Sequence, residues 1–350
     1  MNRRECLSAI LLTSSVLALP GCHLAATSRR RQVMTVNGLI DANDMGFTLV
    51  HEHLFADLRS YEEQLRQNIP VDTDEVIEVV LPYLIAIREF GCRTLIDCTA
   101  THLGRHPGLI KRLSDASGLH MLTVTGNYLS ADGRFIAPYV NSDSAEQLAA
   151  RWSSEWRDGI SDTRIRPGLI KLGMNGGPLS ELEKKVFEAA VITHQRTGLP
   201  IAVHIGPWHE VEPGFNARSA VEQIEMLKRA HVSPSAWVWV HAQNETTRHH
   251  HVQAAKEGAW ISFDGLSTET LELHIECVEH MRSQGLLHRT LVSHDAGWYN
   301  AGQPRGGTFR SFDTAFTTFI PALRQGGFTQ TEIDQIFVTN PAEAFSIRSA

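Results

Sequence analysis

The segment Thr48-Leu49-Val50-His51-Glu52-His53-Leu54 is predicted to form a short apolar strand that carries two histidines in an H-x-H step. Side chains two residues apart on a strand point to the same face, so both imidazoles can reach one point in space. The pattern therefore indicates a place where a metal ion can bind. Taken alone it is a weak signal, because a pair of exposed or hydrogen-bonded histidines gives the same sequence.

Eight apolar segments, this one included, alternate with helical patterns along the chain. The seven later ones are residues 93–98, 121–128, 168–173, 200–204, 237–241, 259–265 and 290–295. Strands that are apolar on both faces and alternate with helices are typical of a (β/α)8 barrel. The alternative is an open doubly wound sheet, which would place a glycine-rich phosphate-binding turn where this chain has His51-Glu52-His53. We therefore predict an α/β fold, a TIM barrel that forms a single domain over residues 33–350.

The composition is that of a globular protein with a large core, since 42% of the 350 residues are hydrophobic and 20% are charged. The net charge of -7 and the lack of a basic stripe argue against a nucleic-acid partner. The five cysteines show no C-x-x-C spacing, so neither a disulfide scaffold nor a cysteine zinc site is indicated.

Residues 1–22 are predicted to be an export signal. They combine a basic start at Arg3-Arg4, an apolar run over residues 9–19 that is too short to span a bilayer, and the tetrad Leu19-Pro20-Gly21-Cys22. The tetrad resembles the lipobox of bacterial lipoproteins, which implies a lipid on Cys22 and a periplasmic or outer-membrane-anchored protein. The paired arginines are similar to a twin-arginine signal. A plain secretory peptide is the alternative, and residues 23–32 are expected to be a tether.

Six side chains at the predicted C-terminal halves of these strands suit a metal centre, because in a barrel those strand ends face one common site. They are His51, His53, Lys171, His204, His241 and Asp295. Imidazoles and a carboxylate are ligands that zinc and related metals prefer, and six groups are too many for one tetrahedral ion with an open position. The set predicts two divalent ions, zinc being the expected metal, that generate hydroxide at neutral pH and polarise a carbonyl or phosphoryl oxygen.

Lys171 is the unusual member of this set. An ammonium group has three donors and no lone pair, so it cannot bind a cation. Its neutral amine can react with carbon dioxide to give a carbamate, N6-carboxylysine, which is anionic and able to bridge two metals. The alternative is a lysine cation that pairs with a carboxylate or extends to solvent.

These residues and their surroundings resemble the phosphotriesterase family of the amidohydrolase superfamily, from about residue 35 to residue 345. The resemblance rests on residues 48–54, on Ile170-Lys171-Leu172-Gly173, on Thr197-Gly198-Leu199-Pro200 before His204, on Ser293-His294-Asp295, and on Asn340-Pro341 with Phe345. It implies that His51, His53 and Asp295 hold one metal and that His204 and His241 hold the other. It also implies that carbamylated Lys171 and a hydroxide lie between the metals, and that Asp295 accepts a proton from the attacking hydroxide.

Members of that family act on organophosphate triesters or on lactones and other carboxylic esters. Tyr128 resembles the tyrosine that lactonase members place against the substrate carbonyl; a tyrosine that only caps a loop is the alternative. Asn244 stands where relay-assisted triesterases carry an acidic residue, and Gly265 where several members carry a basic one. We therefore expect a small-molecule lactone or ester substrate, with organophosphate triesters as the alternative. A non-catalytic metal-binding lipoprotein is the third hypothesis, and a homodimer is left open.

Three further expectations concern residues near these motifs. Arg305 follows the last strand, in a segment expected to form a lid, and is a candidate contact for an anionic or sugar-like substrate. His249-His250-His251 is expected to lie on the exposed surface of a helix. His294 is expected to point away from the metal site, since it neighbours Asp295 on the same strand.

Overall fold

Parallel strands form the centre of the structure, a computed structural model that describes residues 31–206 and 212–348. The predicted export signal and all but the last two residues of the predicted tether lie outside the described residues. The larger sheet has the strand order β11-β10-β9-β8-β7-β6 and the smaller has β12-β3-β4-β5. Every pairing within them is parallel. The strands are β3 (Phe47–Ala56), β4 (Cys92–Asp97), β5 (His120–Leu122), β6 (Val124–Thr125), β7 (Leu169–Met174), β8 (Ile201–Ile205), β9 (Trp237–Val240), β10 (Trp260–Asp264), β11 (Thr290–Ser293) and β12 (Gly297–Asn300).

Two connections join these sheets. Only Thr123 separates β5 from β6, so both belong to the strand expected at 121–128. On the other side β3 contacts the end of β11, where the Asp295 backbone N–H donates to the His51 carbonyl at 3.0 Å and the His51 N–H donates to Ser293 Oγ at 3.0 Å. The predicted α/β fold with parallel sheets is confirmed, and the strand order is consistent with a (β/α)8 barrel.

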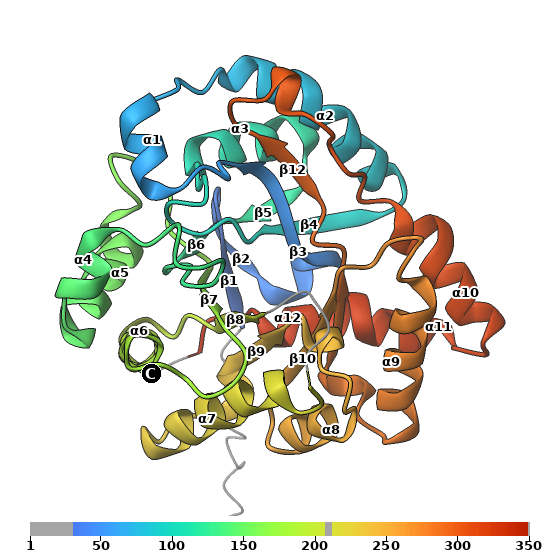
Figure 1. Cartoon of the computed structure of the whole chain (residues 1–350). Coiled ribbons are helices and arrows are strands. Elements are labelled where there is room, and N and C mark those ends of the chain that lie inside the picture. Colours follow the sequence, from blue (N-terminus) through green and yellow to red (C-terminus); the bar gives the residue numbers. More distant parts are fainter. Residues whose placement is uncertain (1–30, 207–211, 349–350) are drawn as a thin grey trace, which may run out of the picture. The chain divides into compact units, whose positions relative to one another are not determined.

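Helices surround the strands, as Figure 1 shows. Their ends carry the expected signals: Ser180 caps α6 through a capping box with Glu183, and Gly198 ends it in a left-handed conformation. None of the described helices is both long enough and apolar enough to cross a membrane. They are α1 (Tyr61–Gln67), α2 (Thr73–Glu89), α3 (Pro107–Ser117), α4 (Pro138–Ser142), α5 (Ala145–Asp158), α6 (Glu181–Thr197), α7 (Phe215–Arg229), α8 (His249–Lys256), α9 (Leu271–Ser283), α10 (Ile320–Gln325), α11 (Gln330–Asp334) and α12 (Asn340–Ala344).

A separate apolar cluster fills the inside of the strand ring. Each strand turns alternate residues inward, and these pack with residues from the short hairpin of β1 (Gln32–Thr35) and β2 (Gly38–Asp41) and from α12. The cluster includes Val33, Val50, Ile96, Leu122, Leu169, Val238, Trp260, Leu291 and Phe345. Burying each large apolar side chain is worth about 1.5–3 kcal/mol. This cluster fills the rest of the ring interior. The polar site therefore lies at the C-terminal ends of the strands.

Strand β3 is longer than the sequence indicates. The sequence pattern predicts an end at Leu54, but the strand continues to Ala56 because β12 pairs with its second half, Gly297 opposite His53 and Tyr299 opposite Phe55. Gly297 has a φ of 93°, and a Cβ atom there would lie 2.1 Å from the His53 carbonyl oxygen. The H-x-H step therefore lies inside a strand that is hydrogen-bonded on both sides.

Candidate metal centre

One cavity of about 200 Å³ brings together Tyr128 and every side chain that the sequence analysis proposed as a metal ligand. Polar residues from the C-terminal halves of the strands line it, and Leu58, Cys98, Leu103, Ala131, Arg134, Phe135 and Trp298 complete its wall. The predicted residues that line it are His51, His53, Tyr128, Lys171, His204, His241 and Asp295. The structure thus confirms that they are neighbours; their roles as ligands stay a prediction.

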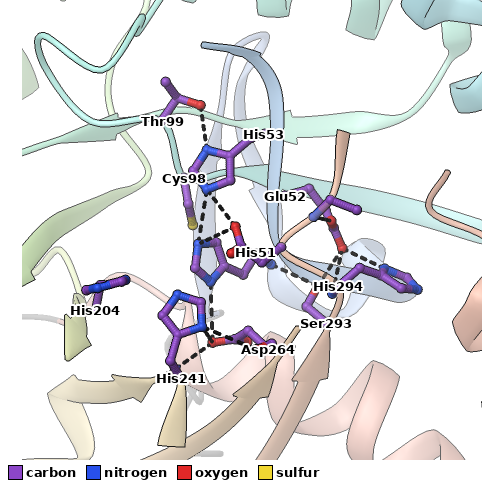
Figure 2. Close-up of polar contacts among 12 residues, drawn as sticks. His51, Glu52, His53, Cys98, Thr99, His204, His241, Asp264, Ser293 and His294 are labelled. Carbon is purple, nitrogen blue, oxygen red and sulfur yellow. Dashed lines mark hydrogen bonds and ion pairs between the residues drawn. The ribbon is translucent and has the colours of Figure 1, made fainter. Parts of the chain in front are cut away.

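The first candidate metal site consists of His51, His53 and Asp295, whose ligand atoms all lie within 4.8 Å of one another. The two imidazole Nε2 atoms are 3.3 Å apart, and Asp295 Oδ1 lies 3.1 Å from His53 Nε2 and 3.7 Å from His51 Nε2. Figure 2 shows both rings of β3 turned toward the same point. Two imidazoles and one carboxylate around a single point match the donor set that zinc prefers.

The second pair of predicted ligands is His204 on β8 and His241, the residue that follows β9. The rings of His204 and His241 have centroids 4.6 Å apart, and the His241 ring is 4.9 Å from that of His51. Three of the four histidines therefore lie in a row along the strand ends. Lys171 lies on β7, beside His204 on β8, and only 1% of it is exposed.

Burial determines the charge state of these groups. It lowers the pKa of His51 and His204 well below the ordinary value and lowers the pKa of His53 and His241 to about 3. The imidazoles are therefore neutral at pH 7 and keep a lone pair for a metal. Burial also lowers the pKa of Lys171, which favours its neutral amine.

Two acidic residues that the sequence analysis did not assign to the site hold its ligands in place. Asp264, fully buried at the end of β10, places Oδ2 3.3 Å from His51 Nδ1 and accepts a hydrogen bond from the His241 backbone N–H at 3.0 Å. Its oxygens, with the ring nitrogens of His51 and His241, also form a group that could itself hold a metal. We assign it to positioning His241, from whose backbone N–H it accepts a hydrogen bond, because it does not line the cavity. The rule that selected the predicted ligands, a polar residue at the end of an apolar strand, would also have selected Asp264.

Glu52 is the second such residue, and it lies on the opposite face of β3 from the two histidines. Its carboxylate accepts hydrogen bonds from the backbone N–H groups of His294 at 3.1 Å and Ala296 at 2.9 Å, on either side of Asp295. It also accepts hydrogen bonds from Ser293 Oγ at 2.7 Å and from His294 Nδ1 at 2.8 Å (Figure 2). As expected, His294 points away from the cavity. Glu52 thus fixes the backbone that presents Asp295.

Tyr128 lies over Gly173 of β7, where a Cβ atom would come within 2.3 Å of the tyrosine ring. Its hydroxyl is 3.1 Å from His204 Nε2. Burial raises the pKa of Tyr128, so the hydroxyl keeps its proton and remains a donor. On the other wall Trp298 stacks on His53 with a centroid distance of 3.8 Å and donates from Nε1 to the Asp295 carbonyl at 2.8 Å.

Two sequence-based expectations about nearby residues are wrong. Arg305 does not line the cavity; it is exposed and pairs with Glu78 of α2 at 2.8 Å. His251 is buried rather than exposed, because it turns inward from α8 and places Nε2 2.7 Å from the Ala242 carbonyl. In both cases the direction of the side chain is set by a neighbouring element and not by the local pattern.

Comparisons with known proteins identify the family of this chain. The model of the family described as "Phosphotriesterase family" matches residues 31–345. The Phosphotriesterase homology protein of Escherichia coli K12 is 28% identical over 86% of this chain and 98% of its own length. The N-acetyltaurine hydrolase of Danio rerio is 26% identical over 89% of this chain and 97% of its own length. A solved structure described as "Molecular Engineering of Organophosphate Hydrolysis Activity from a Weak Promiscuous Lactonase Template" has a TM-score of 0.78 and 26% identity, over 90% of this chain and 99% of that one.

Proposed function

Because this chain belongs to the phosphotriesterase family of hydrolases, we propose that it hydrolyses a lactone or another carboxylic ester with the help of two divalent metal ions. The observation that carries the proposal is the convergence of four neutral imidazoles, a buried lysine and a carboxylate in one cavity that also contains a tyrosine hydroxyl.

The donor set fits two ions. His51, His53 and Asp295 would hold one, and His204 and His241 the other. Lys171 is 1% exposed, and burial lowers its pKa even though the nearby Asp264 and Asp295 carboxylates favour its charged form. A buried ammonium is costly, which argues against the alternative of a lysine cation. Addition of carbon dioxide to the neutral amine forms an N–C bond and releases a proton to solvent, and the resulting carboxylate would lie between the ions. When bound, the ions supply an activated water at neutral pH and polarise the oxygen of the electrophile.

The protein's own residues supply the other parts of the reaction. Asp295 projects into the cavity, where its carboxylate would lie beside the nucleophilic water and take up a proton from it. Tyr128 offers a protonated hydroxyl beside His204, where it would donate a hydrogen bond to the carbonyl oxygen of a lactone or ester. The apolar wall formed by Leu58, Leu103 and Phe135 would exclude bulk water from the bound substrate.

Hydrolysis of organophosphate triesters is the second candidate. It is favoured by the similar solved structure whose description names organophosphate hydrolysis. Two residues of this chain argue for the ester. Asn244 cannot ionise and so cannot take a proton from Asp295 in a relay. Gly265 has a φ of 122°, a backbone conformation that residues with side chains rarely adopt. A basic residue at position 265 would therefore strain the backbone.

A substrate panel tests the proposal. The purified protein would be analysed for metal content and assayed with γ- and δ-lactones, aryl esters and a dialkyl aryl phosphate. We expect about two ions per chain and higher kcat/KM for lactones than for the triester. The Tyr128→Phe variant should lose lactone turnover by about tenfold or more, and triester turnover by less. Equal losses on both substrates would remove the argument for lactones, and metal-loaded protein without any turnover would favour the non-catalytic alternative.

We also propose that the chain is exported and carries a lipid on Cys22, from the sequence of residues 1–22. Labelling of the expressed protein with a radioactive fatty acid tests this. The wild type should carry label and Cys22→Ser should not. An unlabelled wild type would contradict lipidation and favour the alternative, a plain secretory peptide.

A further inference from the structure

The mouth of the metal cavity carries a positively charged side chain that the proposed reaction does not use. Arg134 is exposed, and it lines the same cavity as the predicted ligands. The only other Lys, Arg, Asp or Glu side chains among the described residues that line this cavity are Lys171 and Asp295, which belong to the metal centre. Arg134 is therefore the remaining fixed charge that a bound substrate would meet.

The chain holds Arg134 in a defined position. Ala131, Asp132 and Gly133 before it have φ values of 57°, 56° and 71°, a tight left-handed loop. The loop is closed by the Arg134 N–H, which donates to the Ala131 carbonyl at 3.2 Å, while the Arg134 carbonyl accepts from the Tyr61 N–H at 2.8 Å. The guanidinium carbon lies 5.6 Å from the centroid of the Phe135 ring. These contacts fix the backbone from which the Arg134 side chain extends.

One wall of the cavity connects this arginine to the reacting end. The Phe135 ring lies 6.0 Å from the Tyr128 ring, and the Tyr128 hydroxyl is 3.1 Å from His204 Nε2. A substrate whose carbonyl meets Tyr128 would therefore extend along this wall toward Arg134.

The charge of Arg134 is not neutralised by an ion pair within the described residues. By contrast, Arg59 pairs with Asp57 at 2.6 Å and Arg305 with Glu78 at 2.8 Å. Glu63 is the acidic residue that faces Arg134, but its Oε2 is occupied by the N–H and Oγ of Ser60, each at 2.8 Å, in the cap of α1.

There is also room beyond the arginine. Leu58 and Arg134 line a second, outer cavity of about 360 Å³, together with the polar side chains of Arg59, Glu63, Gln67, Asn300 and Gln303. A charged group at Arg134 would thus remain partly hydrated, which lowers the cost of taking it out of water.

We propose that Arg134 binds an anionic group of the substrate, a carboxylate or sulfonate, at the end remote from the bond that is cleaved. The planar guanidinium offers two parallel donors to two oxygens of such a group. The inference rests on the proposed function and narrows its substrate class to small esters or lactones that carry a fixed negative charge. Arg134, and not Arg305 as the sequence suggests, would therefore contact the anionic group of the substrate.

The test compares matched substrates that differ only in charge. Acetate esters of 2-hydroxyethanesulfonate, 3-hydroxypropanesulfonate and 4-hydroxybutanesulfonate would be assayed against the corresponding methyl sulfones, which are neutral and similar in shape. Sulfonates are poor metal ligands, so direct binding to the metals is kept small. We expect the wild type to prefer the sulfonate at one chain length. Arg134→Gln should lower kcat/KM for that sulfonate about three- to tenfold and kcat/KM for the sulfone by less.

Two further variants and a salt series distinguish charge from structure. Arg134→Lys should restore part of the preference, and Arg305→Gln, which removes an exposed arginine outside the cavity, should leave it intact. Raising the ionic strength from about 0.01 M to about 1 M shortens the Debye length from about 30 Å to about 3 Å and should reduce the preference of the wild type only. An unchanged preference in Arg134→Gln would overturn the inference.

A binding measurement separates this inference from the proposed function. Fluorine NMR would follow 4-fluorobenzenesulfonate and the neutral 4-fluorophenyl methyl sulfone with metal-loaded wild type and Arg134→Gln. Weaker sulfonate binding by the variant supports the anion site even if no ester is hydrolysed, a result that would defeat only the proposed reaction. Hydrolysis of neutral esters together with equal sulfonate binding by both proteins would defeat the anion site and leave the proposed reaction standing.

Discussion

Lys171 is the residue in which stability and chemistry are most directly linked. Its side chain lies inside the strand ring, where a buried cation is unfavourable, and burial lowers its pKa despite the nearby Asp264 and Asp295 carboxylates. Conversion to a carbamate would remove the cation and at the same time provide the bridging carboxylate. The proposed carbamate would therefore account both for the buried lysine and for a ligand shared by the two proposed metals.

Replacing Lys171 tests this at the residue scale. Lys171→Ala should lose bound metal and lower kcat by more than about a hundredfold, because the bridging carboxylate is gone. A short carboxylic acid such as propionate should restore part of both, since it can enter the space left by the side chain. Lys228→Ala, which removes an exposed lysine paired with Glu257, is the matched control. Full metal content and activity in Lys171→Ala would contradict the carbamate.

At the scale of elements, helix α8 is attached to the barrel through His251. The side chain is 1% exposed, packs between Trp239 of β9 and Phe263 of β10, and places Nε2 2.7 Å from the Ala242 carbonyl. Burial lowers the pKa of His251 to about 4. The folded protein therefore contains His251 in its neutral form at pH 7.

This pKa shift makes the attachment of α8 sensitive to acid. The unfolded chain takes up a proton near pH 6.5, whereas folded His251 does so only near pH 4. Its contribution to stability is therefore complete above pH 6.5 and is lost as the pH falls from 6.5 to 4, by about 3 kcal/mol in all. His251→Gln keeps a donor for Ala242 and should show a flatter dependence of the unfolding midpoint on pH. His249→Gln, at an exposed position of α8, should follow the wild type, and identical curves for all three proteins would refute the assignment.

At the scale of the whole described domain, the ring of strands is closed by a contact between its first and last members. Glu52 of β3 joins the backbone on both sides of Asp295, and the His294 ring extends the contact because its Nε2 accepts from the Ala315 N–H at 3.0 Å. With Nε2 an acceptor and Nδ1 a donor to Glu52, His294 is a neutral ring of defined tautomer. Residues more than two hundred positions apart are thus joined by one carboxylate.

Replacing Glu52 should therefore open the ring. In Glu52→Gln one oxygen becomes an NH2 group that faces donors, and leaving buried donors unsatisfied should lower the free energy of unfolding by about 2–4 kcal/mol. The measurement is the midpoint of urea unfolding, followed together with metal content, because Asp295 would lose its support. Glu78→Gln, an exposed change on α2, should stay within about 0.5 kcal/mol of the wild type. A Glu52→Gln protein as stable as this control would show that the contact does not hold the ring closed.

The sequence by itself determined the order of strands and helices and most residues of the candidate site. Strand periodicity is a local property, and the rule that polar residues end apolar strands selected His51, His53, Lys171, His204, His241 and Asp295 without knowledge of their partners.

Only the tertiary structure decided which loop side chains reach the cavity and what holds the ligands in place. Arg134 rather than Arg305 lies at the mouth, β3 continues beyond Leu54, and Glu52 meets the far end of the chain. The physical reason is that a loop residue has no periodicity to fix its direction, and a buried carboxylate takes its donors from whichever strands the closed ring places beside it.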